Sequence, residues 1–120
     1  MKISSSAPTA SPPEAAQPTG CPLTAALNAI GGKWCMICLY WLGSRTRRFN
    51  ELQRLVPDIS HKVLTETLRN LQREGLVTRT DFTEVPPRVE YRISPYGESV
   101  RPLIEAVRLW GRAHLGRRRS

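Results

Sequence analysis

The spacing of apolar residues along the chain predicts four helices before residue 75. Apolar side chains recur three and four residues apart in each segment, which is the period of a helix that buries one face. Glycine or proline follows each segment and is expected to end it, with Gly43 ending the second helix and Gly75 the fourth. The predicted helices cover residues 22–30, 33–42, 49–56 and 61–73.

Two of these helices carry clear start signals. Pro22 follows Cys21, and proline is favoured at the first helical position because the amide hydrogen that it lacks has no partner there. Ser60 can cap the first amides of the fourth helix, and Ile59 can pack on Leu64 one turn later. These signals place helix starts at residues 22 and 61.

The second helix is apolar on nearly every side, including Met36, Leu39 and Tyr40, so it is expected to be covered on most faces. Its expected buried stripe, with the i, i+3, i+4 and i+7 spacing, consists of Trp34, Ile37, Cys38 and Trp41. The basic segment 44–48 follows this helix and is predicted to be a loop.

The pattern after Gly75 predicts a β-hairpin followed by a long helix. Residues 76–82 and 88–94 are rich in β-branched and aromatic side chains, and residues 83–87 connect them. A start signal at residues 94–95 opens the last helix, whose apolar face consists of Tyr96, Val100, Leu103, Ile104, Val107 and Trp110. A short helix, a turn, a capped helix and a hairpin follow the order of an α+β winged helix-turn-helix, here flanked by N- and C-terminal helices.

Composition divides the chain into one domain and two tails. Residues 1–20 are rich in Ser, Ala, Thr and Pro and are predicted to be disordered. The domain spans residues 21–114, and residues 115–120 form a short basic tail. Three cysteines do not suit a disulfide scaffold, which favours a cytoplasmic location. No segment has the roughly 18 to 20 consecutive apolar residues of a membrane span.

Charge points to a polyanionic partner. Lys and Arg number 18 against 10 Asp and Glu, giving a net charge of +8, and 15 of the 18 are arginine. A domain this basic is typical of binding to nucleic acid or to an acidic membrane surface. The forked arginine side chain matches phosphates and guanine edges, which favours nucleic acid.

The fourth predicted helix presents hydrogen-bonding side chains opposite its leucines. They are His61, Lys62, Thr65, Glu66, Arg69 and Arg73, of which only Glu66 is acidic. The second helix of a helix-turn-helix enters the major groove. We therefore expect double-stranded DNA to be contacted there by Ser60, His61, Lys62, Thr65 and Arg69. An ordinary solvated helix face is the alternative.

Arginines outside this helix are candidates for further DNA contacts. Arg45, Arg47 and Arg48 are expected to contact phosphates. The adjacent prolines 86 and 87 stiffen the hairpin connection, so that Arg88 is expected to project into a minor groove. An incidental surface arginine at a turn is the alternative for Arg88.

The cysteines suggest redox chemistry at one position and packing at two. Cys21 stands at a helix start, where the helix dipole lowers a thiol pKa, although a small packed residue is an equal alternative. Cys35 and Cys38 form a C-x-x-C inside an apolar helix, and no second pair completes a zinc site. We expect core packing for both, and no metal, cofactor or catalytic residue. A thiol oxidoreductase and a module that binds RNA or an acidic protein are the rival functions.

The motifs named so far resemble the HxlR-type winged helix regulators of bacteria and archaea. The matching segments, after the Cys-Pro at residues 21–22, are 31–34 (GGKW), 48–52 (RFNEL), 59–65 (ISHKVLT), Leu71 with 74–77 (EGLV), and 84–91 (EVPPRVEY). The resemblance spans about residues 21–112. It departs after Trp34, where Cys35-Met36-Ile37-Cys38 stands in place of the usual polar or aliphatic residues.

The resemblance implies a transcriptional regulator, here expected to be a repressor, that binds a pseudo-palindromic operator as a homodimer. It also implies a response to oxidants or electrophiles in some members through the cysteine that matches Cys21. The first and last helices are expected to form the dimer, because an apolar face of that length usually marks an interface. The interface candidates are Leu23, Leu27, Val100, Ile104, Val107 and Trp110. Neither the operator nor any small-molecule effector can be named from the sequence.

Overall fold

The computed structural model describes residues 20–119, which fall into two compact units that meet after Gly31. The first unit contains helix α1 (Pro22–Ile30), with Cys21 at its N-cap and proline in its first turn, as predicted. Leu23 and Leu27 are exposed on this helix. The predicted disorder of residues 1–19 lies outside the described residues.

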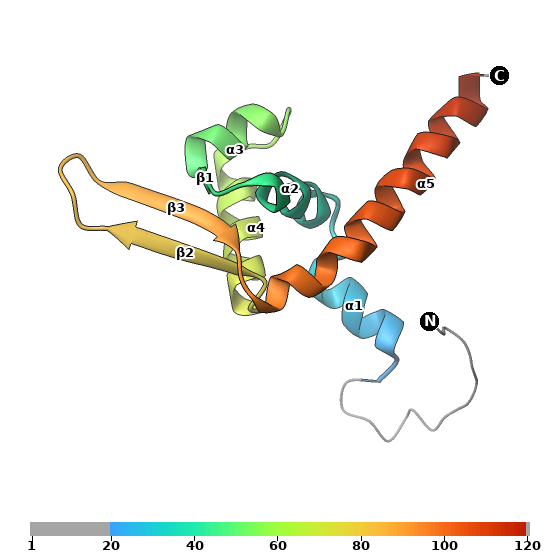
Figure 1. The fold of residues 1–120 in the computed structure, drawn as a ribbon, viewed down its shortest axis with the longest axis horizontal. Coiled ribbons are helices and arrows are strands. Elements are labelled where there is room, and N and C mark those ends of the chain that lie inside the picture. Colours follow the sequence, from blue (N-terminus) through green and yellow to red (C-terminus); the bar gives the residue numbers. More distant parts are fainter. Residues whose placement is uncertain (1–19, 120) are drawn as a thin grey trace. The chain divides into compact units, whose positions relative to one another are not determined.

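The second unit begins with three helices and one short strand. Helix α2 (Lys33–Ser44) is followed by the two-residue strand β1 (Arg47–Arg48), helix α3 (Phe49–Leu55) and helix α4 (His61–Arg73). Figure 1 shows α3 and α4 beside α2, with the hairpin of β2 (Val77–Phe82) and β3 (Arg88–Ile93) extending away from them. This is the predicted winged helix-turn-helix, and the hairpin is its wing.

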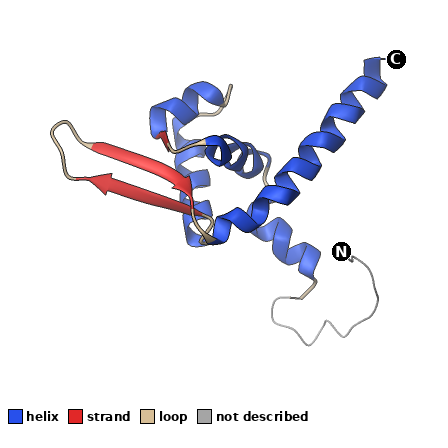
Figure 2. Ribbon diagram, in the orientation of Figure 1, coloured by secondary structure: helices blue, strands red, loops and turns tan. Residues whose placement is uncertain are grey.

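The sheet is antiparallel, in the order β1-β3-β2. Figure 2 shows the two long strands of the wing, and their register pairs Val77 with Ile93 and Arg79 with Tyr91. Strand β1 pairs with the other edge of β3, with Arg47 opposite Tyr91. The prediction of a loop at residues 44–48 is therefore wrong: Ser44 ends α2, and Arg47–Arg48 form a strand whose two residues are too few to leave a pattern in the sequence.

The core of the second unit is built from leucines and from the thiols of α2. The fully buried side chains include Leu52 of α3 and Leu64, Leu68 and Leu71 of α4, the last three as predicted. The predicted buried stripe of α2 is wrong, because the observed stripe is shifted by one residue along the chain. Cys35, Cys38, Leu39 and Leu42 are buried, whereas both tryptophans of the helix are only half-buried. Since nearly every residue of α2 is apolar, two adjacent stripes satisfy the helical spacing equally well.

Helix α4 is fixed at both ends by the expected signals. The Ser60 Oγ accepts a hydrogen bond from the Val63 amide at 3.0 Å, which is the predicted N-cap. At the other end, Gly75 has φ of 78°, and its amide and that of Leu76 donate to carbonyls of the last turn. This C-terminal arrangement requires a residue in the left-handed backbone conformation, which glycine adopts without strain. Both ends of the predicted fourth helix are confirmed.

The last helical segment begins differently from the prediction. A 3₁₀-helix (Tyr96–Val100) precedes α5 (Arg101–Arg119). The Ser94 Oγ accepts a hydrogen bond from the Gly97 amide at 2.8 Å and donates one to the Gly75 carbonyl at 2.5 Å. Helix α5 continues to Arg119, so the expected boundary after residue 114 corresponds to no change of secondary structure.

Within residues 20–119, no single helix has the length and apolar composition to cross a membrane; α1 and α2 reach both only when taken together.

Candidate nucleic-acid interface

The exposed side of α4 divides into a crest and a flank. The crest lies directly opposite the buried leucines and consists of Lys62, Glu66, Arg69 and Arg73, all exposed. His61 and Thr65 lie on the flank that turns toward the sheet, where Thr65 is half-buried. His61, Thr65 and Arg69, which follow one another at four-residue intervals along α4, line one hollow together, with Arg69 at the border between crest and flank.

Two of the predicted DNA-contacting residues at the start of α4 also have structural roles. The His61 ring lies against the Phe49 ring of α3, with centroids 4.7 Å apart. The Ser60 oxygen is used as the N-cap, which leaves its hydroxyl hydrogen available as a donor. Contact with DNA at this end of α4 would therefore be made by side chains that are already held in place.

A hollow of about 420 Å³ lies along the flank of α4. It is lined by Phe49, His61, Thr65, Arg69, Gln72, Arg79 and Tyr91. Arg79 and Tyr91 come from β2 and β3, where they face each other across the sheet. The hollow thus brings together side chains from α3, α4 and the base of the wing.

The sequence interpretation missed Arg79, although a signal for it exists. Side chains alternate between the two faces of a strand, so Arg79 shares a face with Tyr91, while Thr80 and Arg92 lie on the opposite face with Phe82. Counting from the buried Val77 places Arg79 on the face that is covered by α4. The prediction of the two strands rests on their β-branched and aromatic residues, which do not distinguish the two faces of the sheet.

Arg88 is held by the wing itself. Its guanidinium pairs with Glu84 at 2.7 Å and with Glu90 at 2.8 Å, and it lies 3.7 Å from the centre of the Phe82 ring. The hydrogen bonds from Arg88 lower the pKa of Glu84, and the same bonds raise the pKa of Arg88. Two carboxylates therefore balance the charge of Arg88 and Phe82 supports its side chain, so the expected minor-groove contact of Arg88 stays a prediction that requires these ion pairs to open.

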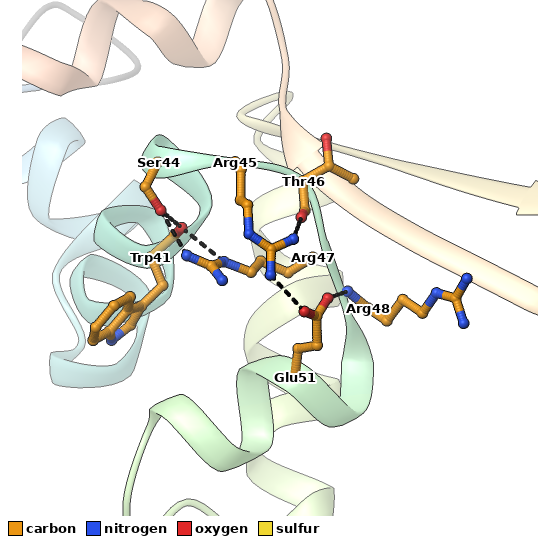
Figure 3. A network of polar contacts seen from close by, with 7 residues as sticks. All are labelled: Trp41, Ser44, Arg45, Thr46, Arg47, Arg48 and Glu51. Atoms are coloured by element: carbon orange, nitrogen blue, oxygen red, sulfur yellow. Dashed lines mark hydrogen bonds and ion pairs between the residues drawn. The ribbon is translucent and has the colours of Figure 1, made fainter.

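The basic segment between α2 and α3 is organised around Glu51. Figure 3 shows the Glu51 carboxylate accepting hydrogen bonds from the Arg45 guanidinium at 2.7 Å and from the Arg48 amide at 2.9 Å. These bonds, the amide first, lower the pKa of Glu51. The Arg47 guanidinium donates to the Ser44 hydroxyl and to the Trp41 carbonyl at the end of α2.

Arg48 is the arginine of this segment whose side chain points away from the network (Figure 3). Its guanidinium makes no ion pair within residues 20–119. It borders a polar hollow of about 650 Å³ that also includes Arg54, a basic residue that the sequence interpretation did not single out. Of the predicted phosphate contacts, Arg48 is therefore the one whose guanidinium makes no ion pair within residues 20–119, although it acts electrostatically on Glu84, whereas Arg45 and Arg47 hold the connection between α2 and α3.

The three cysteines lie in different environments. Cys21 is exposed at the start of α1, while Cys35 and Cys38 are buried in α2, as expected for core residues. Burial, and then the neighbouring Cys35, raise the pKa of the Cys38 thiol to about 12. Catalytic thiols need a lowered pKa, so Cys38 is unsuited to thiol redox catalysis. The described residues contain no cluster of potential metal ligands.

The dimer candidates of α5 are only partly covered within their own unit. Val100 and Ile104 are half-buried, whereas Val107 and Trp110 are exposed, and the Trp110 ring stacks on His114. Leu23 and Leu27 of the first unit are 65% and 57% exposed. Exposed apolar side chains of this number are unusual on a small domain unless another surface covers them.

Known proteins match both the sequence and the fold. The HTH-type transcriptional regulator YdeP of Bacillus subtilis is 41% identical over 98 residues, which cover 82% of this chain and 77% of YdeP. The crystal structure of the HTH-type regulator YtcD has a TM-score of 0.77 at 38% identity, covering 80% of this chain and 98% of that one. The redox regulator HypR in its oxidised form has a TM-score of 0.75 at 38% identity, covering 78% and 96%.

The family match covers most of the described residues. The HxlR-like helix-turn-helix family matches residues 29–119, from the end of α1 to the end of α5. The match therefore includes α4, the wing and the whole of α5. The chain belongs to the HxlR-like helix-turn-helix family of DNA-binding transcriptional regulators.

Proposed function

We propose that this protein is a sequence-specific repressor that occupies a double-stranded DNA operator with α4 in the major groove. The observation that carries the proposal is the crest of α4, where Lys62, Arg69 and Arg73 are exposed with one acidic neighbour, Glu66. The three leucines opposite them leave α4 no freedom to rotate. A helix whose donors are fixed in this way can enter a major groove without rearrangement.

The proposed contacts fall into two classes. Lys62 and Arg69 at the crest read base edges, assisted by Ser60, His61 and Thr65 at the start and flank of α4. Arg47, Arg48 and Arg88 contact the backbone or the minor groove. Arg48 is supported best among these, because its guanidinium makes no ion pair within residues 20–119. Arg47 and Arg88 must first leave the partners described above.

We further propose a two-fold homodimer that binds a pseudo-palindromic operator. The exposed apolar side chains of α1 and α5 support this assembly, since an isologous contact between two copies would cover them. Half-sites about one helical turn apart, roughly 34 to 36 Å, would then be read by two copies of α4. The proposed interface consists of Leu23, Leu27, Val100, Ile104, Val107 and Trp110.

Cys21 is the proposed sensor of oxidants or electrophiles. Two facts support it: its thiol is exposed at the N-cap of α1, and HypR, a protein of the same fold, is a redox regulator. The thiol at a helix N-terminus is stabilised as the thiolate, which is the reactive form. Its place in a helix of the proposed interface would link modification to the spacing of the two α4 helices.

The experiment is footprinting of the full chain on the DNA upstream of its own gene, with and without mild oxidant. A protected pseudo-palindrome, competed by duplex DNA and not by single-stranded RNA, is the expected result, because single-stranded RNA offers no major groove and the narrow major groove of paired RNA does not admit a helix. Inhibition of transcription in vitro from that promoter tests the repressor role. Equal competition by RNA would overturn the proposal.

Variants of α4 sharpen the test. Arg69→Ala should cost about 1 to 3 kcal/mol of binding free energy and relax the base preference at one operator position. Arg92→Ala is a matched control, because it removes the same charge from the sheet face that lies away from α4. If both variants bound the operator with native affinity and discrimination, the orientation proposed for α4 would be wrong.

A further inference from the structure

The hollow on the flank of α4 is unusual in its charge. Its lining contains two arginines, Arg69 and Arg79, and no acidic residue. The nearest carboxylate to Arg79 is that of Asp81, at 3.9 Å, and the Asp81 side chain is 61% exposed. The other polar hollows of the second unit contain glutamates among their lining residues. This hollow therefore holds positive charge that the protein does not itself neutralise.

Its position relative to α4 indicates which part of DNA it would meet. A helix with its side chains is about 10 to 12 Å across, and the major groove is about 12 Å wide. A helix seated in the groove therefore has its crest toward the bases and its flanks against the two walls, which are formed by phosphates. The hollow lies on a flank, between α4 and the base of the wing.

The lining residues suit a phosphodiester better than a base. Arg79 of β2 lines the hollow together with Arg69 and Thr65 of α4, so its guanidinium can donate to an anion in a space that a second positive charge borders. Tyr91, at 8% exposed, is the buried residue of the lining. The Phe49 ring holds His61 at one side.

We infer that this hollow is a phosphodiester subsite, in which Arg79 of β2 holds one backbone phosphate of the DNA beside the base-reading Arg69 of α4. The inference rests on the proposed function, since it assumes that α4 lies in the major groove. It gives Arg79 a role that differs from those of the other two wing arginines. Arg92 lies on the opposite face of the sheet, and Arg88 is paired with two glutamates.

The test compares Arg79→Ala with Arg92→Ala in the full chain, using operator and unrelated duplexes across a range of salt concentrations. Arg79→Ala should weaken binding to both duplexes by the same factor and make the dependence of log affinity on log salt shallower by about 1. Between 50 and 200 mM salt, the native protein should then lose about fourfold more affinity than this variant. Arg92→Ala should behave like the native protein.

A second measurement locates the phosphate. Operators in which single phosphates are replaced by uncharged methylphosphonates should include one position that weakens the native protein and leaves Arg79→Ala unaffected. A native salt dependence in Arg79→Ala would overturn the inference while leaving operator binding, and with it the proposed function, intact. A change of base preference in Arg79→Ala would assign the residue to a base and would also overturn it. Arg79→Gln, which keeps most of the side chain, serves if the alanine variant fails to fold.

Discussion

Replacing Ser94 by alanine should destabilise the protein more than the small size of the serine side chain suggests. Ser94 is 8% exposed, and its hydroxyl makes two hydrogen bonds that join the end of α4 to the start of the 3₁₀-helix. One is donated to the Gly75 carbonyl, and the other is accepted from the buried Gly97 amide. Ser94→Ala removes both bonds and leaves the Gly97 amide without this acceptor.

The magnitude follows from those two bonds. Each intramolecular hydrogen bond contributes about 0.5 to 1.5 kcal/mol net, and a buried polar group left unsatisfied costs about 1 to 3 kcal/mol. We therefore expect Ser94→Ala to lower the free energy of unfolding by about 2 to 4 kcal/mol. For a domain of this size the lower figure corresponds to a fall in Tm of roughly 8 °C.

Urea unfolding at one fixed protein concentration is the assay, since an oligomer's stability depends on concentration. Ser99→Ala is the matched control: the Ser99 hydroxyl donates to the Tyr96 carbonyl at 2.7 Å on the exposed side of the same 3₁₀-helix. That variant should change stability by about 0.5 kcal/mol or less. Equal effects of the two substitutions would refute the reasoning, because burial of the Ser94 bonds would then contribute nothing.

Four further predictions concern charge, the buried thiol of Cys38, oxidant sensing and assembly. Glu84→Gln should release Arg88 from one of its partners and raise the affinity for operator and unrelated duplexes alike, measured by fluorescence anisotropy; an unchanged affinity for both would contradict a DNA contact by Arg88. Because the folded Cys38 thiol has a pKa of about 12 against an ordinary value of 9.0, the folded state keeps its proton more tightly, and stability is lost as pH rises through that interval, by about 1.4 kcal/mol per pH unit. The Cys38→Ala variant should show a smaller loss between pH 9 and pH 10 in urea titrations, and an identical loss would show that this thiol is not buried in solution. Mild oxidant should alter operator affinity in the native protein and in Cys35→Ser and Cys38→Ser but not in Cys21→Ser, and loss of the response in either α2 variant would move the sensor to α2. Val107→Glu should shift the protein from dimer to monomer in sedimentation equilibrium at micromolar concentration, and a native protein that is already monomeric there would contradict the proposed assembly.

The features that could be predicted from the sequence are those set by local chemistry. The Ser60 cap, the glycine at residue 75 and the leucine stripe of α4 each depend on a few neighbouring residues. The two long strands were also predicted to within one residue at their ends. Together these features orient α4, so most of its exposed face could be predicted as well.

The features that could not be predicted depend on contacts between distant segments. The half-burial of Trp34 and Trp41, which were expected in the buried stripe, is decided by which elements pack on α2, since its sequence is apolar all round. The strand at Arg47–Arg48 exists because β3 offers it an edge. Arg88 and Glu90 are two residues apart on β3 and share a face of the sheet, so their pairing could be predicted. The pairing of Arg88 with Glu84 depends on the path of the connection between the strands and could not.

The pairing of Arg88 also affects how the thermodynamics of DNA binding are to be interpreted. The salt dependence of binding arises because protein cations displace cations condensed on the DNA. If Arg88 moved from its two carboxylates to a phosphate, those carboxylates would attract cations from solution in place of the ones that the DNA released. A contact made by such an exchange leaves little trace in the salt dependence. The number of phosphates inferred from that dependence would therefore be smaller than the number the protein touches, and the difference would arise at the wing.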